Sequence, residues 1–382
     1  MKSMDAPALR ILVVRLGSMG DVLHALPAVG ALTAMLPDAQ IGWAIEDRWA
    51  ALLCSSPGDR SRAGAGKVRP RSPEQPLVDR IHRINTQVWR TRPLARETWQ
   101  EVRIAFHELR SLHYDVAIDF QGAWKSAAVA LASRASVRLG FCAPREPAAG
   151  VCYTHRLAGE GTHIIEQNLS LLDGIRKLTG GSAAATCKVA SFPPSQLPLD
   201  TAGALWAGEE LARQKLRPGA FAIVNPGAGW AAKRWPVEYY SEVAAGLAES
   251  GIRSLVNFGP GEESLADVVV AGGRGGAVRG QYSLGELIAL TRQAGLFIGG
   301  DTGPMHLAAA LRVPVVAIFG PTDPARNGPY ATEAVVLRSP QSVTNHSRRA
   351  LPDAAMFEIA PARVLSAAHQ LLAKTATRFQ FR

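Results

Sequence analysis

Short runs of apolar, often β-branched residues alternate with helical patterns along most of the chain, which is typical of parallel sheets covered by helices. In the first half the pattern predicts strands at 11–16, 41–45, 78–84, 114–119 and 137–141. It predicts helices at 21–35, 94–112, 123–133 and 163–178. The fold class predicted for this half is therefore α/β, with one doubly wound parallel sheet.

A second α/β series follows a stretch from 179 to 219 that is rich in Gly, Pro and Ser and holds a short helical pattern at 204–214. Its predicted strands are 221–225, 253–258, 296–299, 315–319 and 334–337, and its predicted helices are 237–249, 262–270, 283–293, 304–311 and 361–374. We predict an N-terminal domain at 1–180, a linker region at 181–218 and a C-terminal domain at 219–382, whose last helix is a candidate to pack back on the first domain. Two such sheets in tandem predict a central cleft facing the carboxyl ends of the strands.

Composition excludes several classes of protein. Hydrophobic residues make up 47% of the 382 residues, which excludes a disordered or fibrous chain. The four cysteines include no C-x-x-C pair and the nine histidines form no zinc signature, so we expect neither a disulfide framework nor a bound metal. Arg15 interrupts the first apolar run, and no run approaches the roughly 18 residues that span a bilayer. The sequence therefore predicts a cytoplasmic protein.

Positive charge is concentrated in one stretch. The chain has 42 Lys and Arg against 32 Asp and Glu, and residues 60–110 alone hold twelve basic and five acidic residues. Such a stretch predicts an anionic partner, either nucleic acid, phospholipid headgroups or an acidic sugar, or else a solvated surface. Few aromatic residues interrupt it, and it contains no known nucleic-acid module, so we expect no nucleic-acid partner. Residues 54–76 lack apolar periodicity and predict a long mobile loop.

The first strand runs directly into a glycine-rich turn, Arg15-Leu-Gly-Ser-Met-Gly-Asp21. A turn of this kind, placed before a helix, exposes N–H groups to a diphosphate. It is not the G-x-G-x-x-G of dinucleotide-binding folds, although Glu46 follows the second strand as their ribose-binding acid does. A nicotinamide-dependent oxidoreductase therefore stays a weaker alternative. Asp21 is a candidate helix cap and equally a candidate general base.

Three further glycine-rich turns follow strands in the second half, at 225–230, 299–303 and 319–324. Lys233 follows the first of them and offers a point charge suited to phosphate. Asp301 is either a helix cap or a ligand-binding acid, and His306 is either a buried core histidine or a ligand contact. Glycine-rich turns at the same ends of successive strands favour a nucleotide as ligand.

Taken together, the motifs resemble glycosyltransferase family 9, the bacterial lipopolysaccharide heptosyltransferases. The resemblance rests on Ser18-Met-Gly-Asp-Val-Leu-His-Ala-Leu-Pro27, Lys233-x-Trp235-Pro236, Asp301-Thr-Gly-x-x-His306 and Phe319-Gly-Pro-Thr-Asp-Pro324. The stretch 118–126 is similar to the family's D-x-Q-G-x-x-K-S, and 145–147 is similar to its R-E-P. Two features depart from the family, namely the longer Arg-rich loop at 55–76 and Ala228 and Gly229, where some members have hydroxyl residues.

The resemblance implies a GT-B fold of two Rossmann-like domains and inverting transfer from ADP-L-glycero-D-manno-heptose to a Kdo residue, with no metal and no cofactor. It implies that Asp21 is the general base, with a backbone contact from Gly20. Lys233 is then the cation at the phosphates. The other implied donor-binding residues are Glu262 at the ribose, with Glu263 as an alternative register, and Asp301, Thr302, Gly303 and His306 at the diphosphate and heptose.

On the acceptor side, the resemblance implies that Arg90, Arg92 and Arg145 bind the acidic Kdo-lipid A. The enzyme would then associate peripherally with the anionic cytoplasmic face of the inner membrane. The form of the first turn is more similar to the enzyme that adds the first heptose than to the one that adds the second. A family 9 transferase that uses another sugar nucleotide or glycan acceptor is the alternative within the family.

Overall fold

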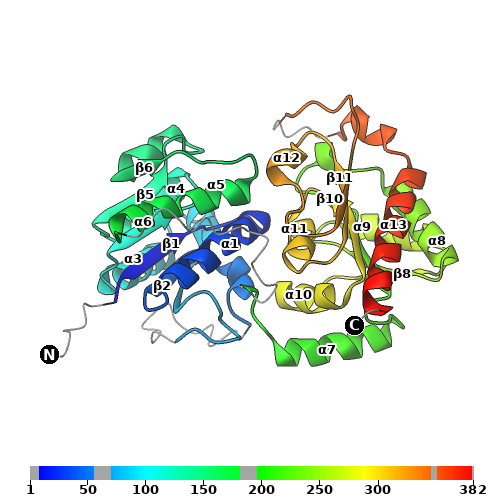
Figure 1. The fold of residues 1–382 in the computed structure, drawn as a ribbon, viewed down its shortest axis with the longest axis horizontal. Coiled ribbons are helices and arrows are strands. Elements are labelled where there is room, and N and C mark those ends of the chain that lie inside the picture. Colours follow the sequence, from blue (N-terminus) through cyan, green and yellow to red (C-terminus); the bar gives the residue numbers. More distant parts are fainter. Residues whose placement is uncertain (1–7, 56–69, 181–195, 346–350, 381–382) are drawn as a thin grey trace. The chain divides into compact units, whose positions relative to one another are not determined.

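The structure is a computed structural model, and it describes residues 8–55, 70–180, 196–345 and 351–380. It divides into two compact units, Met1–Leu199 and Asp200–Arg382. Each is an α/β unit built on its own sheet (Figure 1). Helix α7 (Thr201–Arg213), which falls within the predicted linker region, belongs to the second unit.

The first unit contains a six-stranded sheet in the order β3-β2-β1-β4-β5-β6, with every neighbouring pair parallel. Its strands are β1 (Arg10–Val14), β2 (Gln40–Glu46), β3 (Arg80–Ile84), β4 (Val116–Asp119), β5 (Val137–Phe141) and β6 (His155–Leu157). Ile11 to Val14 of β1 are fully buried. A continuous apolar run of this kind is what a central parallel strand needs, because helices cover both of its faces.

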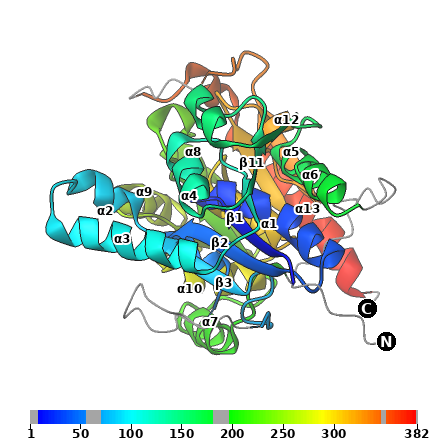
Figure 2. The same cartoon turned by 90° about the vertical axis from the view of Figure 1, so that its left-hand side faces the viewer.

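Helices cover both faces of this sheet (Figure 2). They are α1 (Met19–Met35), α2 (Thr86–Thr91), α3 (Arg96–Ser111), α4 (Trp124–Ala132), α5 (Ile164–Ser170) and α6 (Leu172–Leu178), with short 3₁₀ helices η1 (Asp47–Leu52) and η2 (Pro147–Cys152). Leu12 and Val14 pack with Leu109 of α3 and Val129 of α4 on one face. Helix α1 packs against α5 on the other.

The second unit repeats this arrangement, with the order β12-β11-β10-β7-β8-β9 and parallel pairs throughout. Its strands are β7 (Phe221–Asn225), β8 (Arg253–Asn257), β9 (Ala277–Gly280), β10 (Leu296–Gly300), β11 (Val315–Phe319) and β12 (Ala334–Arg338). Counted within each unit, the first strand lies between the second and the fourth. This is the strand order of Rossmann-type folds.

Two apolar layers enclose the second sheet. One joins Val224 and Ile298 to α8 (Val237–Glu249), α9 (Glu263–Gly272) and the C-terminal α13 (Pro361–Gln380). The other joins Ile223 and Phe297 to α7, α10 (Leu284–Gln293) and α11 (Gly303–Ala310). The remaining short elements of this unit are η5 (Ala231–Lys233), α12 (Pro324–Asn327) and η6 (Ala354–Glu358). The terminal helix thus packs on the sheet of its own unit.

The periodicity predicts the central strands closely, and the differences lie at the edges. It misses the edge strands β6 and β9, each three or four residues long and not fully buried, together with the short helix α2. The helix predicted at 163–178 is two helices that meet at Leu171. The loop predicted at 54–76 lies mostly outside the described residues, and its last part forms an isolated bridge between Ser72 and Gln75.

A glycine in β2 allows a buried polar cluster to form beside the sheet. A Cβ on Gly42 would lie 1.9 Å from Tyr114 Oη, which is 2.7 Å from His82 Nε2. We therefore expect G42A to displace Tyr114 and to lower the free energy of unfolding by about 1–3 kcal/mol, measured by denaturant titration. G208A, in exposed space on α7, is the control and should raise the free energy of unfolding by roughly 0.5–1 kcal/mol. Equal effects of the two substitutions would contradict the prediction.

Candidate functional site

Most of the residues predicted to carry chemistry lie where the strand order of each sheet reverses. In the first unit this point lies between β1 and β4, and in the second it lies between β7 and β10. Loops that leave adjacent strands in opposite directions open a crevice at this point, and open α/β sheets bind their ligands there. The loops at 15–21 and 119–122 meet the first reversal point, and those at 225–233 and 300–306 meet the second.

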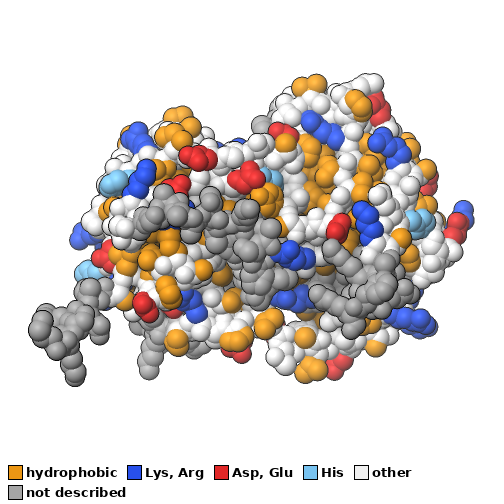
Figure 3. Space-filling view, viewed as in Figure 1, with side chains coloured by type: hydrophobic (Ala, Val, Ile, Leu, Met, Phe, Trp, Pro, Cys, Tyr) orange, Lys and Arg blue, Asp and Glu red, His pale blue; other side chains and the backbone are white. Residues whose placement is uncertain are grey.

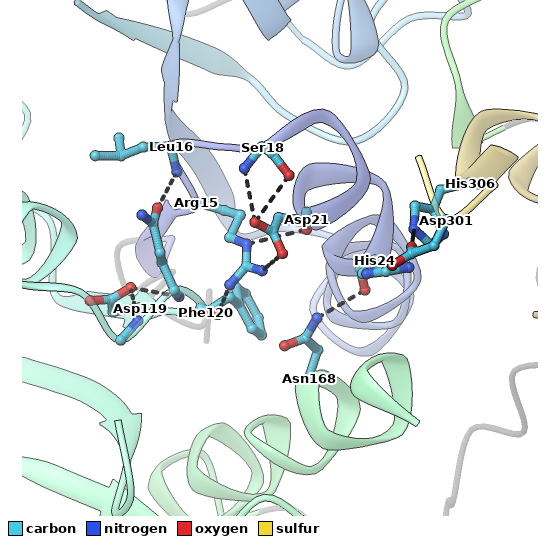
Figure 4. A network of polar contacts seen from close by, with 12 residues as sticks. Arg15, Leu16, Ser18, Asp21, His24, Asp119, Phe120, Asn168, Asp301 and His306 are labelled. Carbon is cyan, nitrogen blue, oxygen red and sulfur yellow. Dashed lines mark hydrogen bonds and ion pairs between the residues drawn. The ribbon is translucent and has the colours of Figure 1, made fainter. Parts of the chain in front are cut away.

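Asp21 lies in the first turn of α1, and its two carboxylate oxygens have different partners (Figure 4). Oδ2 accepts hydrogen bonds from the Ser18 N–H at 2.9 Å and from Ser18 Oγ at 3.2 Å. Oδ1 pairs with Arg15 Nη2 at 2.7 Å, and the Asp21 side chain is 32% exposed. The carboxylate therefore takes part in capping the helix while about a third of its surface stays accessible.

The surroundings of Asp21 keep it ionised. Burial raises the pKa of Asp21, but the charge of Arg15 and the hydrogen bonds from Ser18 outweigh this effect and hold the pKa below its ordinary value. The charge of Arg145 lowers the pKa further. A partly exposed carboxylate with these neighbours stays deprotonated at neutral pH, which a general base requires.

Arg15 connects the loops that follow β1 and β4. Its guanidinium is almost completely buried and pairs with Asp21 Oδ1. It also donates from Nε to the Asp21 backbone oxygen at 3.2 Å, and from Nη1 to the backbone oxygen of Phe120. Arg15 is not among the site residues predicted from the sequence. Its signal in the sequence is a cation placed directly after a fully apolar strand.

The D-x-Q-G stretch, which follows β4, supports the loop after β1. Asp119 is fully buried and accepts hydrogen bonds from the Gln121 N–H at 2.8 Å, Ser126 Oγ at 2.8 Å and Tyr153 Oη at 2.7 Å. Gln121 Oε1 in turn accepts from the Leu16 N–H at 2.9 Å. Burial raises the pKa of Asp119 despite these bonds. The stretch thus holds the loop after β1 in position through the hydrogen bond between Gln121 and Leu16.

Arg145 lies in the same group of loops. Gly122 has a φ of +65°, and a Cβ there would lie 3.0 Å from the Arg145 nitrogen, so glycine is needed for the close approach. Glu146 N donates to the Gly122 oxygen at 2.9 Å, which fixes this segment beside the D-x-Q-G turn. Arg145 itself is exposed. Arg145 is close enough to Asp21 for its charge to lower the pKa of that carboxyl, and its role at an acceptor site stays a prediction.

The other two predicted acceptor residues lie elsewhere in the first unit. Arg90 is on α2 and Arg92 directly follows it, and both side chains are exposed. Gly20 is buried in the first turn of α1, next to Asp21. On the face drawn in Figure 3, Lys and Arg of the described residues are interspersed with Asp, Glu and apolar side chains.

The basic residues of the stretch 60–110 do not form a single surface among the described residues. Three of its arginines are paired with carboxylates, Arg71 with Asp79, Arg80 with Glu108 and Arg83 with Asp47. Four of its basic residues, at positions 60, 62, 67 and 69, lie outside the described residues. The exposed arginines that remain belong to α2, α3 and the loop between them. Among the described residues of this stretch, these arginines are the basic surface that is open to an anionic partner.

In the second unit, Lys233, Asp301 and His306 form one cluster. Lys233 Nζ donates to Asp301 Oδ2 and lies 4.1 Å from the ring centroid of Trp230, and His306 Nε2 lies 3.1 Å from Asp301 Oδ1. Each of the three side chains of the cluster is 10% exposed or less. Burial raises the pKa of Asp301, but the hydrogen bond from His306 and the charge of Lys233 hold it well below its usual range. Asp301 is thus a fixed anion between two nitrogen groups.

The cap of the following helix is Thr302, not Asp301. Thr302 Oγ1 donates to the Gly300 oxygen at 3.3 Å, and Gly303 is the first residue of α11. The first N–H groups of a helix have no partner within the helix, and the helix dipole favours an anion there. Gly303 and the start of α11 therefore suit a phosphate.

The structure separates the two adjacent glutamates that the sequence left in doubt. The Glu262 carboxylate accepts from the Gly259 N–H at 3.0 Å and lies against Gly227, where a Cβ would be 2.1 Å from Glu262 Oε2. Glu263 is exposed and accepts from the Gly261 N–H at 3.2 Å. Glu262 thus faces the loop after β7 and is the better candidate for the ribose.

Within the described ranges, no set of three or more His, Cys, Asp or Glu side chains is arranged to hold a metal ion. The polar groups found at both reversal points are instead cation–carboxylate pairs. These pairs suit the binding of anions and of hydroxyl groups.

The comparisons with known proteins agree with this arrangement. A model of glycosyltransferase family 9 (heptosyltransferase) matches residues 102–353. Lipopolysaccharide heptosyltransferase 1 of Escherichia coli strain K12 is 30% identical over 339 residues, which is 87% of this chain and 94% of the relative. Lipopolysaccharide heptosyltransferase 1 of Pseudomonas aeruginosa is 28% identical over 336 residues, 87% of this chain and 84% of the relative.

Solved structures show the same fold. The structure of E. coli heptosyltransferase WaaC with ADP-2-deoxy-2-fluoro heptose has a TM-score of 0.70 and 26% identity, covering 95% of this chain and 99% of its own. That of E. coli ADP-heptose lps heptosyltransferase II has a TM-score of 0.69 and 22% identity, covering 96% and 100%. The predicted GT-B architecture of two Rossmann-like units is confirmed, and the oxidoreductase alternative gives way to a glycosyltransferase. The chain belongs to glycosyltransferase family 9, the heptosyltransferase family.

Proposed function

We propose that this enzyme transfers heptose from ADP-L-glycero-D-manno-heptose to a Kdo residue of the lipopolysaccharide inner core, with inversion and without a metal ion. The observation that carries the proposal is the Asp21 carboxylate, ionised, partly exposed and fixed by Arg15 at the first reversal point. The names of the relatives support heptose as the sugar and lipopolysaccharide as the target. The ADP-linked ligand named with WaaC supports the donor.

On the acceptor side, Asp21 takes the proton of the attacking hydroxyl. The hydroxyl oxygen forms a bond to the anomeric carbon while the bond from that carbon to the phosphate oxygen breaks on the opposite face, and ADP leaves. Arg15 keeps Asp21 ionised and oriented, at the cost of a lower basicity. Arg145, Arg90 and Arg92 offer planar guanidinium groups that suit the carboxylate of an acidic sugar.

On the donor side, the departing ADP develops negative charge as the glycosidic bond breaks. Lys233 and the N–H of Gly303, at the start of α11, stabilise this charge. An ionised carboxylate repels a diphosphate, so we assign Asp301 to holding the Lys233 ammonium and His306 in place, with any direct contact going to heptose hydroxyls. Thr302 shapes this turn, and Glu262 binds the ribose.

The two units then have separate roles, acceptor binding in the first and nucleotide-sugar binding in the second. A lipid-linked acceptor places the reaction at the anionic cytoplasmic face of the inner membrane, so we propose peripheral contact with that surface. None of the described helices is long and apolar enough to cross a membrane.

Donor binding tests the proposal and the assignment of the glutamates together. We expect calorimetric titration to show binding of ADP-heptose without added metal, and little binding of GDP-mannose, UDP-glucose or NADH. E262A should weaken ADP-heptose binding about tenfold or more, because a charge-assisted hydrogen bond to the ribose is lost. E263A is the matched control and should bind as the wild type does. Selective binding of another sugar nucleotide would keep the fold and reject heptose transfer.

The base assignment predicts a loss of turnover without a loss of donor binding. In D21A and D21N, kcat should fall about 10²- to 10⁴-fold, because no group takes the acceptor proton. Mass spectrometry of the product formed on a Kdo-containing acceptor measures this rate. The matched control is S18A, which removes one hydrogen bond to Asp21 but keeps the carboxylate. Full activity in D21N would show that Asp21 is not the base.

The pairing with Arg15 predicts a change in the pH profile. Because Arg15 lowers the pKa of Asp21, its removal in R15Q leaves burial less opposed, and the pKa of Asp21 rises. A base works only when deprotonated, so the acidic limb of kcat/KM should move to higher pH in R15Q. R15K keeps the positive charge and should keep the limb nearer its original position. If the acidic limb of kcat/KM is unchanged in R15Q, Arg15 does not control the ionisation of Asp21.

A further inference from the structure

The helical pair α2–α3 carries exposed apolar and basic side chains that the proposed chemistry does not use together. Figure 2 shows this pair at the edge of the first unit, with the loop between the two helices at its end. Leu94 in that loop is 91% exposed, and Trp99, in the first turn of α3, is 63% exposed. Exposed apolar side chains that are surrounded by polar and charged residues are typical of surfaces that bind a protein or a membrane.

Leu94 and Trp99 are exposed although the pair is well held together. Trp89 of α2 packs edge-to-face on Phe106 of α3, with ring centroids 6.3 Å apart, and its Nε1 donates to Glu101 Oε2 at 3.3 Å. The buried Thr98 Oγ1 donates to the Arg92 oxygen at 2.8 Å. Other aromatic residues therefore fill the interior of the pair. The outward position of Leu94 and Trp99 is built into the fold.

Basic residues surround the two apolar side chains. At 100° per residue, Arg96, Trp99 and Arg103 share one face of α3, separate from the face of the buried Thr98, Ala105 and Leu109. Glu97 and Glu101 lie on the other side of the helix from this face. Over residues 86–104 the pair has four arginines and two glutamates, a net charge of +2. The exposed surface therefore combines an apolar end with a cationic face.

We propose that this surface, formed by Leu94, Arg96, Trp99 and Arg103, docks on a bilayer of anionic phospholipids. Leu94 enters the boundary between headgroups and acyl chains, and Trp99 lies at the headgroup level, where its amphipathic ring is favoured. The two arginines bind lipid phosphates. The inference rests on the proposed function, since a lipid-linked acceptor lies in such a membrane, and it names the part of the chain that meets it.

Cosedimentation of the full chain with vesicles tests the surface. We expect binding to vesicles of phosphatidylcholine and phosphatidylglycerol in equal parts, and weak binding to phosphatidylcholine alone. L94S/W99S should lower the partition coefficient about tenfold or more, and R96Q/R103Q should lower it by about tenfold. L205S/V268S removes two exposed apolar side chains from the second unit and should bind as the wild type does.

Quenching of tryptophan fluorescence by lipids with brominated acyl chains locates the contact. The quenching seen with the wild type should be lost in W99F and kept in W124F, which removes another exposed tryptophan of the same unit. L94S/W99S should transfer heptose at the wild-type rate to a soluble Kdo acceptor without acyl chains. If the wild type has no activity on the soluble acceptor, the proposed function is rejected. Binding to vesicles tests the docking surface separately.

Three results would overturn the inference. These are failure of the wild type to bind the anionic vesicles, equal binding by L94S/W99S, and equal binding to neutral and anionic vesicles. Binding of an acidic protein by the same surface, without binding to vesicles, would assign it to a protein partner instead. Circular dichroism of each variant before the assay distinguishes lost docking from lost folding.

Discussion

The buried guanidinium of Arg15 is the constraint on which the first unit's site depends. A charge removed from water must be paired and hydrogen-bonded, or it destabilises the fold. Arg15, in the loop after β1, meets this requirement with the Asp21 carboxylate and with two backbone oxygens, one in the first turn of α1 and one in the loop after β4. Its pairing therefore fixes the distance between these loops. The position of Asp21 follows from the stability of the fold itself.

The second unit also has a buried cation at its reversal point, but the aspartate that pairs with this cation is less exposed. The two sheets have the same strand order, and at each reversal point a cation pairs with an aspartate. Asp21 is 32% exposed, whereas Asp301 is 8% exposed and is shared between Lys233 and His306. An accessible carboxylate can exchange a proton with a substrate. A buried one held by two nitrogen groups is better suited to keeping a cation in position.

The sequence predicted the buried central strands, but it did not predict contacts between residues that are far apart in the chain. Strands β7 and β11 have the predicted bounds, because a strand covered on both faces is a continuous apolar run. The edge strands β6 and β9 lack such a run. The choice between Glu262 and Glu263 could not be predicted, since it depends on the contact of Glu262 with Gly227 from another strand's loop. The support that Gln121 gives to Leu16 likewise joins residues 105 positions apart.

The sequence also left open whether Asp21 caps a helix or acts as a base, and the two roles prove compatible. The Ser18 N–H and hydroxyl take one carboxylate oxygen, and Arg15 Nη2 takes one lone pair of the other, while part of the side chain is accessible. Capping fixes the orientation of the carboxylate relative to α1. A general base gains from a fixed orientation, because proton transfer needs the correct geometry before it needs the correct pKa. The cap is thus part of what makes Asp21 suited to the role of base.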